Sequence, residues 1–369
     1  MIYLDNGATS LHKPPMVYSA VTNALRRCAN PGRGGHQASM EASRQVYACR
    51  EEASRLFHCP AERVVMTMNC THGLNIAINS LVPPDSRVVI SGFEHNAVTR
   101  PLHDRRAKVR VAGRRLFDWA DTLESFEKAL KSGVDAAVFT HVSNVFGYIL
   151  PVEEMAALCR HYGVPFILDA AQSAGTLPVD MELLGADYIA MPGHKGLLGP
   201  QGTGLLLCGQ EPKPLLFGGT GSESLSQSMP PYLPDIVEAG TLNVPGIAGL
   251  AAGLRYVQSR GIGNIFRQEH RALTRAVADL RALGFKPFAG EHQAATVSFV
   301  PEMDSEQAAE ILSQQGIAVR AGIHCAPLAH ESAGTLGTGT VRISFGHDAN
   351  PGQNAHLRRA LAKIIPERR

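Results

Sequence analysis

The chain contains the stretch Phe166-Ile167-Leu168-Asp169-Ala170-Ala171-Gln172, an apolar run that ends in an acid and is followed by an amide three residues later. Similar short runs, each bounded by turn residues, alternate with stretches of helical periodicity such as Val152–Tyr162. The other predicted strands are Val64–Met68, Arg87–Ser91, Val109–Ala112, Ala136–Val142, Tyr188–Met191 and Gly204–Cys208. This alternation predicts an α/β fold with a mainly parallel sheet that is covered on both faces. Ligands of such sheets bind beyond the carboxyl ends of the strands, which is where Asp169 and Gln172 stand.

The amino-acid composition of the chain changes after the last of these strands. Residues Pro212–Pro245 are rich in Gly, Ser and Pro, which predicts a long irregular loop. A second cluster of elements follows and forms an α+β unit of about a hundred residues, a common size for a domain. Its predicted helices are Gly246–Arg260, Ile265–Leu283, Ser305–Gln315 and Asn354–Ile364, and its predicted strands are Thr296–Val300, Ala318–Gly322 and Thr340–Phe345.

The composition describes a globular chain of enzyme size. Lys and Arg number 35 against 33 Asp and Glu, which leaves a formal charge of +2 over 369 residues. This charge is too small and too evenly mixed for the basic stripe that nucleic-acid binding needs. We find no basic leader and no apolar run of membrane-spanning length, so we expect a cytoplasmic protein without a membrane partner. Seven cysteines without a C-x-x-C pair indicate neither a disulfide framework nor a metal site.

A lysine among glycines carries the first chemical signal. Lys195 lies in Pro192-Gly193-His194-Lys195-Gly196, directly after a predicted strand, on a turn that a ligand can approach closely. Read alone, Lys195 is also consistent with a surface lysine, and Asp169 with a helix N-cap. Together they are the pair that pyridoxal phosphate requires, a Schiff-base lysine and an acid that pairs with the ring nitrogen.

With these residues the chain resembles a known family. The segments Tyr3-Leu4-Asp5-Asn6-Gly7-Ala8-Thr9 and Thr340-Val341-Arg342-Ile343-Ser344 extend the match nearly from end to end. The chain is similar to the class V pyridoxal-phosphate enzymes of fold type I, and among them it most resembles the cysteine desulfurases. The resemblance implies a large cofactor-binding domain over residues 15–250 with a mainly parallel seven-stranded sheet. It also implies a small α+β domain, made of residues 1–14 and 251–369, that carries the nucleophilic cysteine.

The resemblance implies a set of cofactor contacts as well. Lys195 would carry the cofactor, Asp169 would pair with its ring nitrogen, and Gln172 would contact its ring hydroxyl. The remaining implied contacts are His95, which would stack on the ring, the phosphate-binding residues Thr71, His72 and His194, and Thr241, which would come from the other subunit of a homodimer. Without the resemblance these residues also fit ordinary structural roles: loop or buried histidines, an N-cap threonine and a plain turn.

One position departs from the family pattern. The family usually has Ser or Thr two residues before His194, whereas this chain has Pro192. Proline offers neither a hydroxyl nor an N–H group. One hydrogen bond to the phosphate is therefore lost or is supplied from elsewhere.

The sulfur chemistry is expected at Arg320-Ala321-Gly322-Ile323-His324-Cys325-Ala326. Read alone, Cys325 also fits a small buried hydrophobe, but it follows a strand and a glycine and precedes a loop, which favours an exposed position. In the resembling family this pattern holds the nucleophilic cysteine. The resemblance assigns Arg342, a forked donor suited to a carboxylate, and Asn144 to substrate binding, and His36 to the substrate entrance. A surface arginine and a turn asparagine remain alternatives.

The reaction that the resemblance implies is desulfuration of L-cysteine, with selenocysteine as a further possible substrate. The substrate would displace Lys195, the freed amine would take the α-proton, and Cys325 would attack the substrate sulfur, giving alanine and a persulfide for a sulfur-acceptor protein. One alternative is another class V enzyme: a selenocysteine lyase, a cysteine sulfinate desulfinase, an aminotransferase or an epimerase. A second alternative is a non-catalytic module that binds the cofactor for sulfur delivery or regulation. The sequence does not distinguish iron–sulfur cluster assembly, tRNA thiolation and selenium metabolism as the pathway served.

Overall fold

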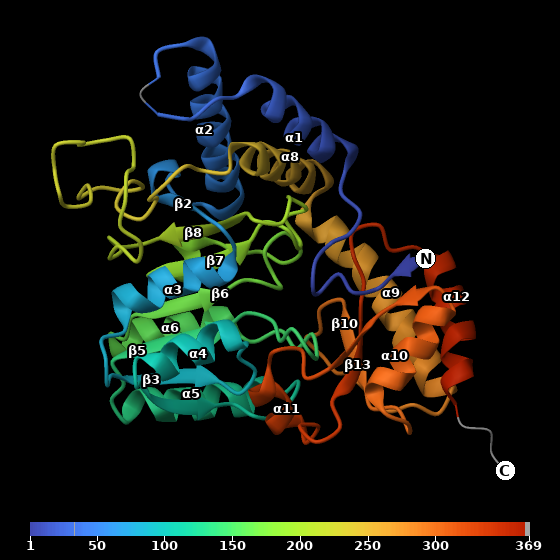
Figure 1. The fold of residues 1–369 in the computed structure, drawn as a ribbon. Helices are drawn as coiled ribbons and strands as arrows, with labels where there is room; N and C mark the ends of the chain where they lie inside the picture. The colour runs from blue at the N-terminus through green and yellow to red at the C-terminus, as the bar shows by residue number, and fades with distance from the viewer. Residues whose placement is uncertain (33, 366–369) are drawn as a thin grey trace.

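The computed structural model describes residues 1–32 and 34–365, and its largest element is a seven-stranded sheet (Figure 1). From edge to edge the strands are β2 (Val64–Thr67), β8 (Gly204–Cys208), β7 (Tyr188–Pro192), β6 (Phe166–Asp169), β5 (Ala136–Thr140), β3 (Arg87–Ser91) and β4 (Lys108–Ala112). Strand β8 runs antiparallel to both of its neighbours, and the other pairs are parallel. The predicted α/β fold with a mainly parallel sheet is confirmed.

Helices cover both faces of this sheet because alternate residues of its strands point to opposite sides. Val89 and Phe139 lie in one hydrophobic core, whereas Val88 and Val138 lie in the other. One face carries α3 (Cys70–Leu81) and α4 (Asn96–Asp104), and the other carries α2 (Gln37–Phe57), α5 (Trp119–Lys131), α6 (Val152–Tyr162) and α8 (Val244–Arg260). Helix α1 (Pro15–Arg27) packs against α8, and the short α7 (Met181–Leu184) precedes β7.

A second sheet lies in the C-terminal part of the chain. Its antiparallel strands are β12 (Arg320–Gly322), β13 (Thr340–Ser344), β10 (Thr296–Phe299) and β9 (Pro287–Phe288), and the nearby helices are α9 (Ile262–Ala282), α10 (Ser305–Gln314), α11 (Pro327–Ala333) and α12 (Pro351–Leu361). This part has a core of its own, which includes Leu4 from the N-terminus. The predicted domain boundary at residue 250 falls within α8, and the division into two domains stays a prediction.

One predicted strand is divided in two. Residues Ala318–Gly322 do not form a single strand, because β11 (Ile317–Ala318) pairs with β1 (Ile2–Tyr3), whereas β12 pairs with β13. The chain changes partners within one residue, which a local apolar pattern cannot indicate. As a result Arg320 lies directly opposite Arg342 in the second sheet.

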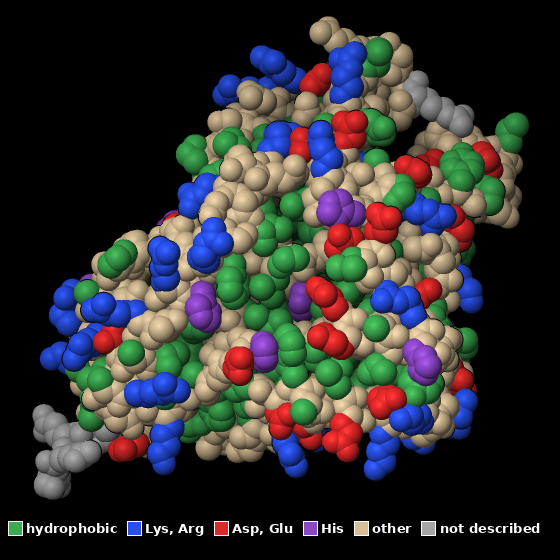
Figure 2. Space-filling model, turned by 180° about the vertical axis from the view of Figure 1, so that it is seen from behind, with side chains coloured by type: hydrophobic (Ala, Val, Ile, Leu, Met, Phe, Trp, Pro, Cys, Tyr) green, Lys and Arg blue, Asp and Glu red, His purple; other side chains and the backbone are tan. Residues whose placement is uncertain are grey.

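The surface carries both signs of charge. On the face in Figure 2, Lys and Arg side chains are interspersed with Asp and Glu side chains, with hydrophobic side chains between them. Among residues 1–32 and 34–365 there is no helix with the length and apolar character needed to cross a bilayer. The same residues contain no group of three or more His, Cys, Asp or Glu placed to hold a metal ion.

Candidate active site

Lys195 lies on the loop that follows β7, where the backbone folds back tightly. The Gly193 N–H donates to Thr203 O at 2.8 Å. The N-terminal segment braces this loop, because Ser10 donates from its N–H to His194 O at 3.0 Å and from Oγ to Lys195 O at 3.1 Å. Burial lowers the pKa of the Lys195 amine. The neutral, nucleophilic form of the amine is thereby favoured.

Asp169 ends β6 and lines the same cavity as Lys195. Its Oδ1 accepts hydrogen bonds from the Ala171 N–H at 2.8 Å and from the Cys70 thiol at 3.5 Å. Burial raises the pKa of Asp169, while the Ala171 N–H and the charge of Lys195 act in the opposite direction. No donor among the described residues reaches Oδ2, so this oxygen is left for a ligand.

Gln172 and His95 line this cavity as well. Gln172 donates one amide hydrogen to Gly7 O at 3.0 Å and keeps the other. His95 is the N-cap of α4, and its Nδ1 accepts the Ala97 N–H at 3.0 Å, so the neutral ring carries its proton on Nε2. Burial, followed by the charge of Lys195, lowers the pKa of His95 to about 4. The ring is therefore uncharged near neutral pH, which suits contact with a flat aromatic ligand.

The start of α3 faces the cavity through Thr71. The N-cap Asn69 accepts the His72 N–H on its Oδ1 at 2.8 Å, while the N–H groups of Cys70 and Thr71 have no acceptor among the described residues. Free N–H groups at a helix start favour an anion. The predicted phosphate contact His72 does not line the cavity: its Nδ1 accepts the Met68 N–H at 3.3 Å, and its Nε2 is buried without a partner.

His194 also lines this cavity, next to Lys195. Its Nδ1 lies 3.0 Å from Thr9 Oγ1, a contact from the same N-terminal segment that braces the loop. Burial lowers the pKa of His194 to about 4, with the charges of Lys195 and Lys13 acting in the same direction. The ring therefore meets a ligand as a neutral hydrogen-bonding group.

Arg342 is buried on β13, with 2% of its surface exposed. Its Nη2 donates to Asp5 Oδ1 at 2.6 Å in an ion pair, and its Nη1 donates to Asn144 O at 2.9 Å. Its Nε is buried without a partner, as is Oδ1 of Asn144, which lines the Lys195 cavity. Buried polar atoms without partners are uncommon, and these two are available to a ligand. A substrate carboxylate at Arg342 would share the guanidinium with Asp5.

Cys325 lies exposed on the turn between β12 and α11, as its sequence position predicts. His324 and Cys325 both have left-handed backbone conformations, with φ of 54° and 55°, which non-glycine residues rarely adopt. Two hydrogen bonds of 2.8 Å hold this turn, from Asn144 Nδ2 to His324 O and from the Asn96 N–H to Cys325 O. Cys325 lines an outer cavity together with His95.

His36 and Thr241 do not line the cavities around Lys195. His36 caps α2, and its Nδ1 accepts the Ser39 N–H at 3.3 Å. Thr241 lines a separate cavity beside Arg50 and Glu238, which form a buried ion pair of 2.7 Å. A single chain therefore does not bring these two predicted residues to the lysine.

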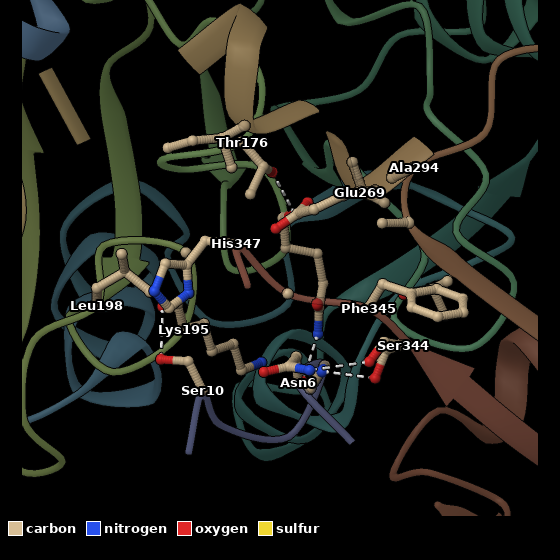
Figure 3. A pocket seen from close by; sticks show the side chains of 18 of the residues that line it. Asn6, Ser10, Thr176, Lys195, Leu198, Glu269, Ala294, Ser344, Phe345 and His347 are labelled. Atoms are coloured by element: carbon tan, nitrogen blue, oxygen red, sulfur yellow. Dashed lines mark hydrogen bonds between the residues drawn. The ribbon is translucent and has the colours of Figure 1, made fainter. Parts of the chain in front are cut away.

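Lys195 also lines a second cavity, shown in Figure 3. Glu269 of α9 points into it, with Thr176 on one side and His347 on another. Glu269 is 5% exposed, and burial together with the charge of Asp348 raises its pKa to about 8. Lys195 thus stands between two cavities, and sequence reasoning missed the buried acid in the second.

Three further contacts escaped prediction although their residues stand inside or beside the motifs quoted above. They are the Cys70 thiol on Asp169, the Asp5 carboxylate on Arg342 and the Asn96 N–H on Cys325 O. Asp5 and Arg342 are 337 residues apart in the sequence. The motifs contained these residues, but local patterns do not indicate partners at such separations.

The residues around the first cavity fit pyridoxal phosphate. A lysine amine, a carboxylate oxygen of Asp169 without a protein donor and a neutral His95 ring line one cavity. The free N–H groups at the start of α3 face the same space and suit a phosphate. These are the groups that the covalent link, the ring nitrogen, the ring face and the phosphate of this cofactor need.

Comparisons with known proteins agree with this reading. Residues 2–353 match the family model of the class-V aminotransferases. The chain is 33% identical over 363 residues to a probable cysteine desulfurase of Pyrococcus abyssi (strain GE5 / Orsay), which covers 94% of this chain and 89% of that protein. The solved apo structure of the cysteine desulfurase from Thermococcus onnurineus NA1 is 32% identical with a TM-score of 0.91, and the match covers 99% of this chain and 94% of that one. For the solved cysteine desulfurase CsdA of Escherichia coli the identity is 26% and the TM-score 0.85, with 98% and 94% covered. The resemblance predicted from the motifs is confirmed, and the chain belongs to the class-V aminotransferase family.

Proposed function

We propose that this chain is a pyridoxal-phosphate-dependent cysteine desulfurase, which converts L-cysteine to L-alanine and carries the released sulfur as a persulfide on Cys325. The position of His95 carries the proposal, because His95 lines both the Lys195 cavity and the outer cavity that contains Cys325. An exposed thiol therefore lies beside the place where a substrate bound near Lys195 would react. The similarity to proteins named cysteine desulfurases supports the same reading.

The cofactor would be held by side chains of the first cavity. Lys195 would bind it covalently, Asp169 would keep a proton at the ring nitrogen, Gln172 would donate to the ring hydroxyl, and the start of α3 would bind the phosphate. When bound, pyridoxal phosphate supplies an electron-withdrawing ring that takes up the electron pair left after loss of the α-proton.

Lys195 would move that proton. Because burial lowers its pKa, the amine is available as a base once the substrate has displaced it. The α-proton would pass to Lys195 Nζ and later return to the carbon skeleton of the product. The loop that holds Lys195 is braced by Ser10, which keeps the amine within the cavity during these steps.

Arg342 and Asn144 would orient the substrate. The free Nε of Arg342 and the free Oδ1 of Asn144 match a carboxylate and an ammonium group, respectively. Asn144 lines the Lys195 cavity, so a substrate held by its side chain would lie beside the lysine. Asn144 also holds the backbone of His324 and therefore links substrate binding to the cysteine turn.

Cys325 would take the sulfur. Its thiolate attacks the sulfur of the substrate, the new S–S bond forms and the bond between that sulfur and Cβ breaks, with the electron pair returning to Cβ, which is then protonated. The balance is L-cysteine plus the Cys325 thiol giving L-alanine plus the Cys325 persulfide. No external oxidant or reductant is consumed.

The proposal also includes a homodimer, a sulfur-acceptor protein and a cytoplasmic location. In the proposed homodimer, Thr241 and His36, which lie away from the Lys195 cavities of their own chain, would contribute to the site of the second copy. A sulfur-acceptor protein is supported by the exposure of Cys325, which a second thiol can reach. A location in the cytoplasm, where thiols remain reduced, belongs to the same proposal.

Mass spectrometry after incubation with L-cysteine tests the proposed function. We expect one extra sulfur on the peptide that contains Cys325, recovered without reductant, together with an equal amount of alanine. Sulfur on another cysteine, or alanine without protein-bound sulfur, would contradict the persulfide. Cysteine sulfinate needs no thiol attack, so a Cys325→Ala variant that still turns over cysteine sulfinate but not cysteine would exclude general misfolding as the cause.

A further inference from the structure

Asn69 places an unused donor at the start of α3. Its Oδ1 accepts the His72 N–H at 2.8 Å, which makes the side-chain amide the N-cap of the helix. This bond determines which end of the amide is the acceptor, so Nδ2 keeps both of its hydrogens. Within residues 1–32 and 34–365 no acceptor lies within hydrogen-bond distance of Nδ2. Asn69 is an exposed residue, so one end of its amide is engaged with the helix and the other faces solvent until a ligand binds.

Asn69, whose Nδ2 is the free end of the amide, is part of the wall of the cavity around Lys195. Asn69 and Pro192 both line that cavity. Pro192 and Thr67 pair with Gly204 of β8 from opposite sides, and Asn69 follows Thr67 by two residues. A Cβ at position 204 would lie 2.8 Å from the carbonyl carbon of Asn69, so only glycine lets the chain approach so closely. Gly204 thus lies between the segments of Asn69 and Pro192, and both of these residues line the same cavity.

The chemistry of this corner suits a phosphate. The free N–H groups of Cys70 and Thr71 point out of the start of α3, a twelve-residue helix whose dipole adds to their attraction for an anion. Pro192 contributes no donor, because its nitrogen carries no hydrogen and its ring no hydroxyl. The Asn69 amide lines the same cavity and is a side-chain donor that the protein leaves unused.

We propose that the Asn69 side-chain amide donates a hydrogen bond to the cofactor phosphate and supplies the bond that Pro192 cannot make. The inference rests on the proposed use of pyridoxal phosphate. Asn69 then acts twice, since its oxygen caps the helix and its nitrogen binds the ligand. The cap sets the direction of the amide before the cofactor arrives, which lowers the entropy lost on binding.

The test measures how tightly the full-length, cofactor-free chain binds pyridoxal phosphate and how tightly it binds pyridoxal. Pyridoxal lacks the phosphate and serves as the internal reference. Asn69→Gly removes the donor at little cost to the helix, because glycine is tolerated at an N-cap. We expect about tenfold weaker binding of pyridoxal phosphate, the size of one hydrogen bond to a charged group, and unchanged binding of pyridoxal. The double variant Asn69→Gly, Pro192→Ser restores a donor in the same corner and should recover most of the loss.

Asn350→Gly is the matched control, because Asn350 caps α12 in the same way, with Oδ1 accepting the N–H groups of Gly352 and Gln353. It should leave both affinities unchanged. If Asn69→Gly weakens both ligands equally, or leaves pyridoxal phosphate within twofold of the wild type, the proposal is wrong. A wild type that binds no pyridoxal phosphate would overturn the proposed function as well, so the two failures are distinguishable.

Discussion

The surroundings of Lys195 and of Cys325 differ, although the proposed function assigns both residues to one site. Lys195 is enclosed between two cavities, on a loop braced by the N-terminal segment. Cys325 is exposed on a turn with left-handed backbone, held by hydrogen bonds from the Asn144 side chain to His324 O and from the Asn96 N–H to Cys325 O. Enclosure strengthens electrostatic interactions and shifts pKa values, which proton transfer needs. The proposed sulfur delivery would instead need a thiol that a second protein can reach, so the proposed function needs both environments in one fold.

Asn144 joins these two regions. Its backbone oxygen accepts from Arg342, its Nδ2 holds the turn at His324 O, and its free Oδ1 faces the site. Asn144 thus contacts both regions, and the Asn96 N–H, which donates to Cys325 O, is a second link to the cysteine turn. Substitutions can separate the contribution of the enclosed Lys195 region from that of the exposed Cys325 region.

Lys195→Ala removes the group on which the enclosed region depends. We expect alanine formation to fall by about 10⁴-fold or more, because the proton at the α-carbon loses its base and the cofactor loses its covalent link. The measurement is the rate of alanine formation, with borohydride reduction and peptide mapping to locate the trapped cofactor. Lys363→Ala, at an exposed position, is the control and should keep the full rate. A residual rate within tenfold of the wild type would place the chemistry elsewhere.

Cys325→Ala removes the exposed nucleophile and leaves the enclosed region intact. We expect about 10³-fold slower alanine formation from L-cysteine with unchanged cofactor absorbance, because sulfur transfer is lost but proton transfer is not. Cys28→Ala, the other cysteine that is not fully buried, is the matched control. Undiminished alanine formation by Cys325→Ala would show that the exposed thiol is not needed for the reaction.

Asp5→Ala breaks the ion pair that holds Arg342 between the N-terminus and the second sheet. Because Arg342 is buried, the loss of its partner should lower the free energy of unfolding by about 3 kcal/mol and raise the KM for L-cysteine. Denaturant unfolding and initial rates measure the two effects. Asp85→Asn removes the charge of an exposed partner of Arg106, keeps a residue that tolerates the left-handed backbone at this position, and should change neither quantity measurably. Similar effects in both variants would argue against a special role for the buried pair.

His95→Gln tests the electrostatics of the enclosure. Burial lowers the pKa of His95 from 6.5 to about 4. The folded chain then binds fewer protons than the unfolded chain between these pH values, so folding loses stability as the pH falls from 6.5 to 4. Without the histidine, this acid-induced loss in the cofactor-free chain should be smaller by about 2 kcal/mol. Unfolding free energies at pH 6.5 and pH 4 give the comparison, and equal losses in variant and wild type would assign the acid sensitivity to other groups.

Much of the fold and part of the site were accessible from the sequence. The seven strands of the large sheet were predicted because each is a short apolar run between turn residues, a local signal. Asp169 at a strand end and Lys195 on a glycine-rich turn were selected for the same reason, since strand ends and turns can be recognised from neighbouring residues. The strand Ala318–Gly322 was predicted as one element because its pattern is continuous, although its two halves pair in different sheets.

The sequence by itself determined the alternation of strands and helices and the residue types at the strand ends, because hydrophobic periodicity and turn chemistry act over a few residues. Tertiary structure alone decided which polar atoms find a hydrogen-bond partner within the protein and which remain available to a ligand. The Asp5 carboxylate on Arg342, the Cys70 thiol on Asp169 and the free Asn69 amide beside Pro192 are such cases. Each depends on segments that are distant in the chain and adjacent in space, and burial gives these contacts their strength.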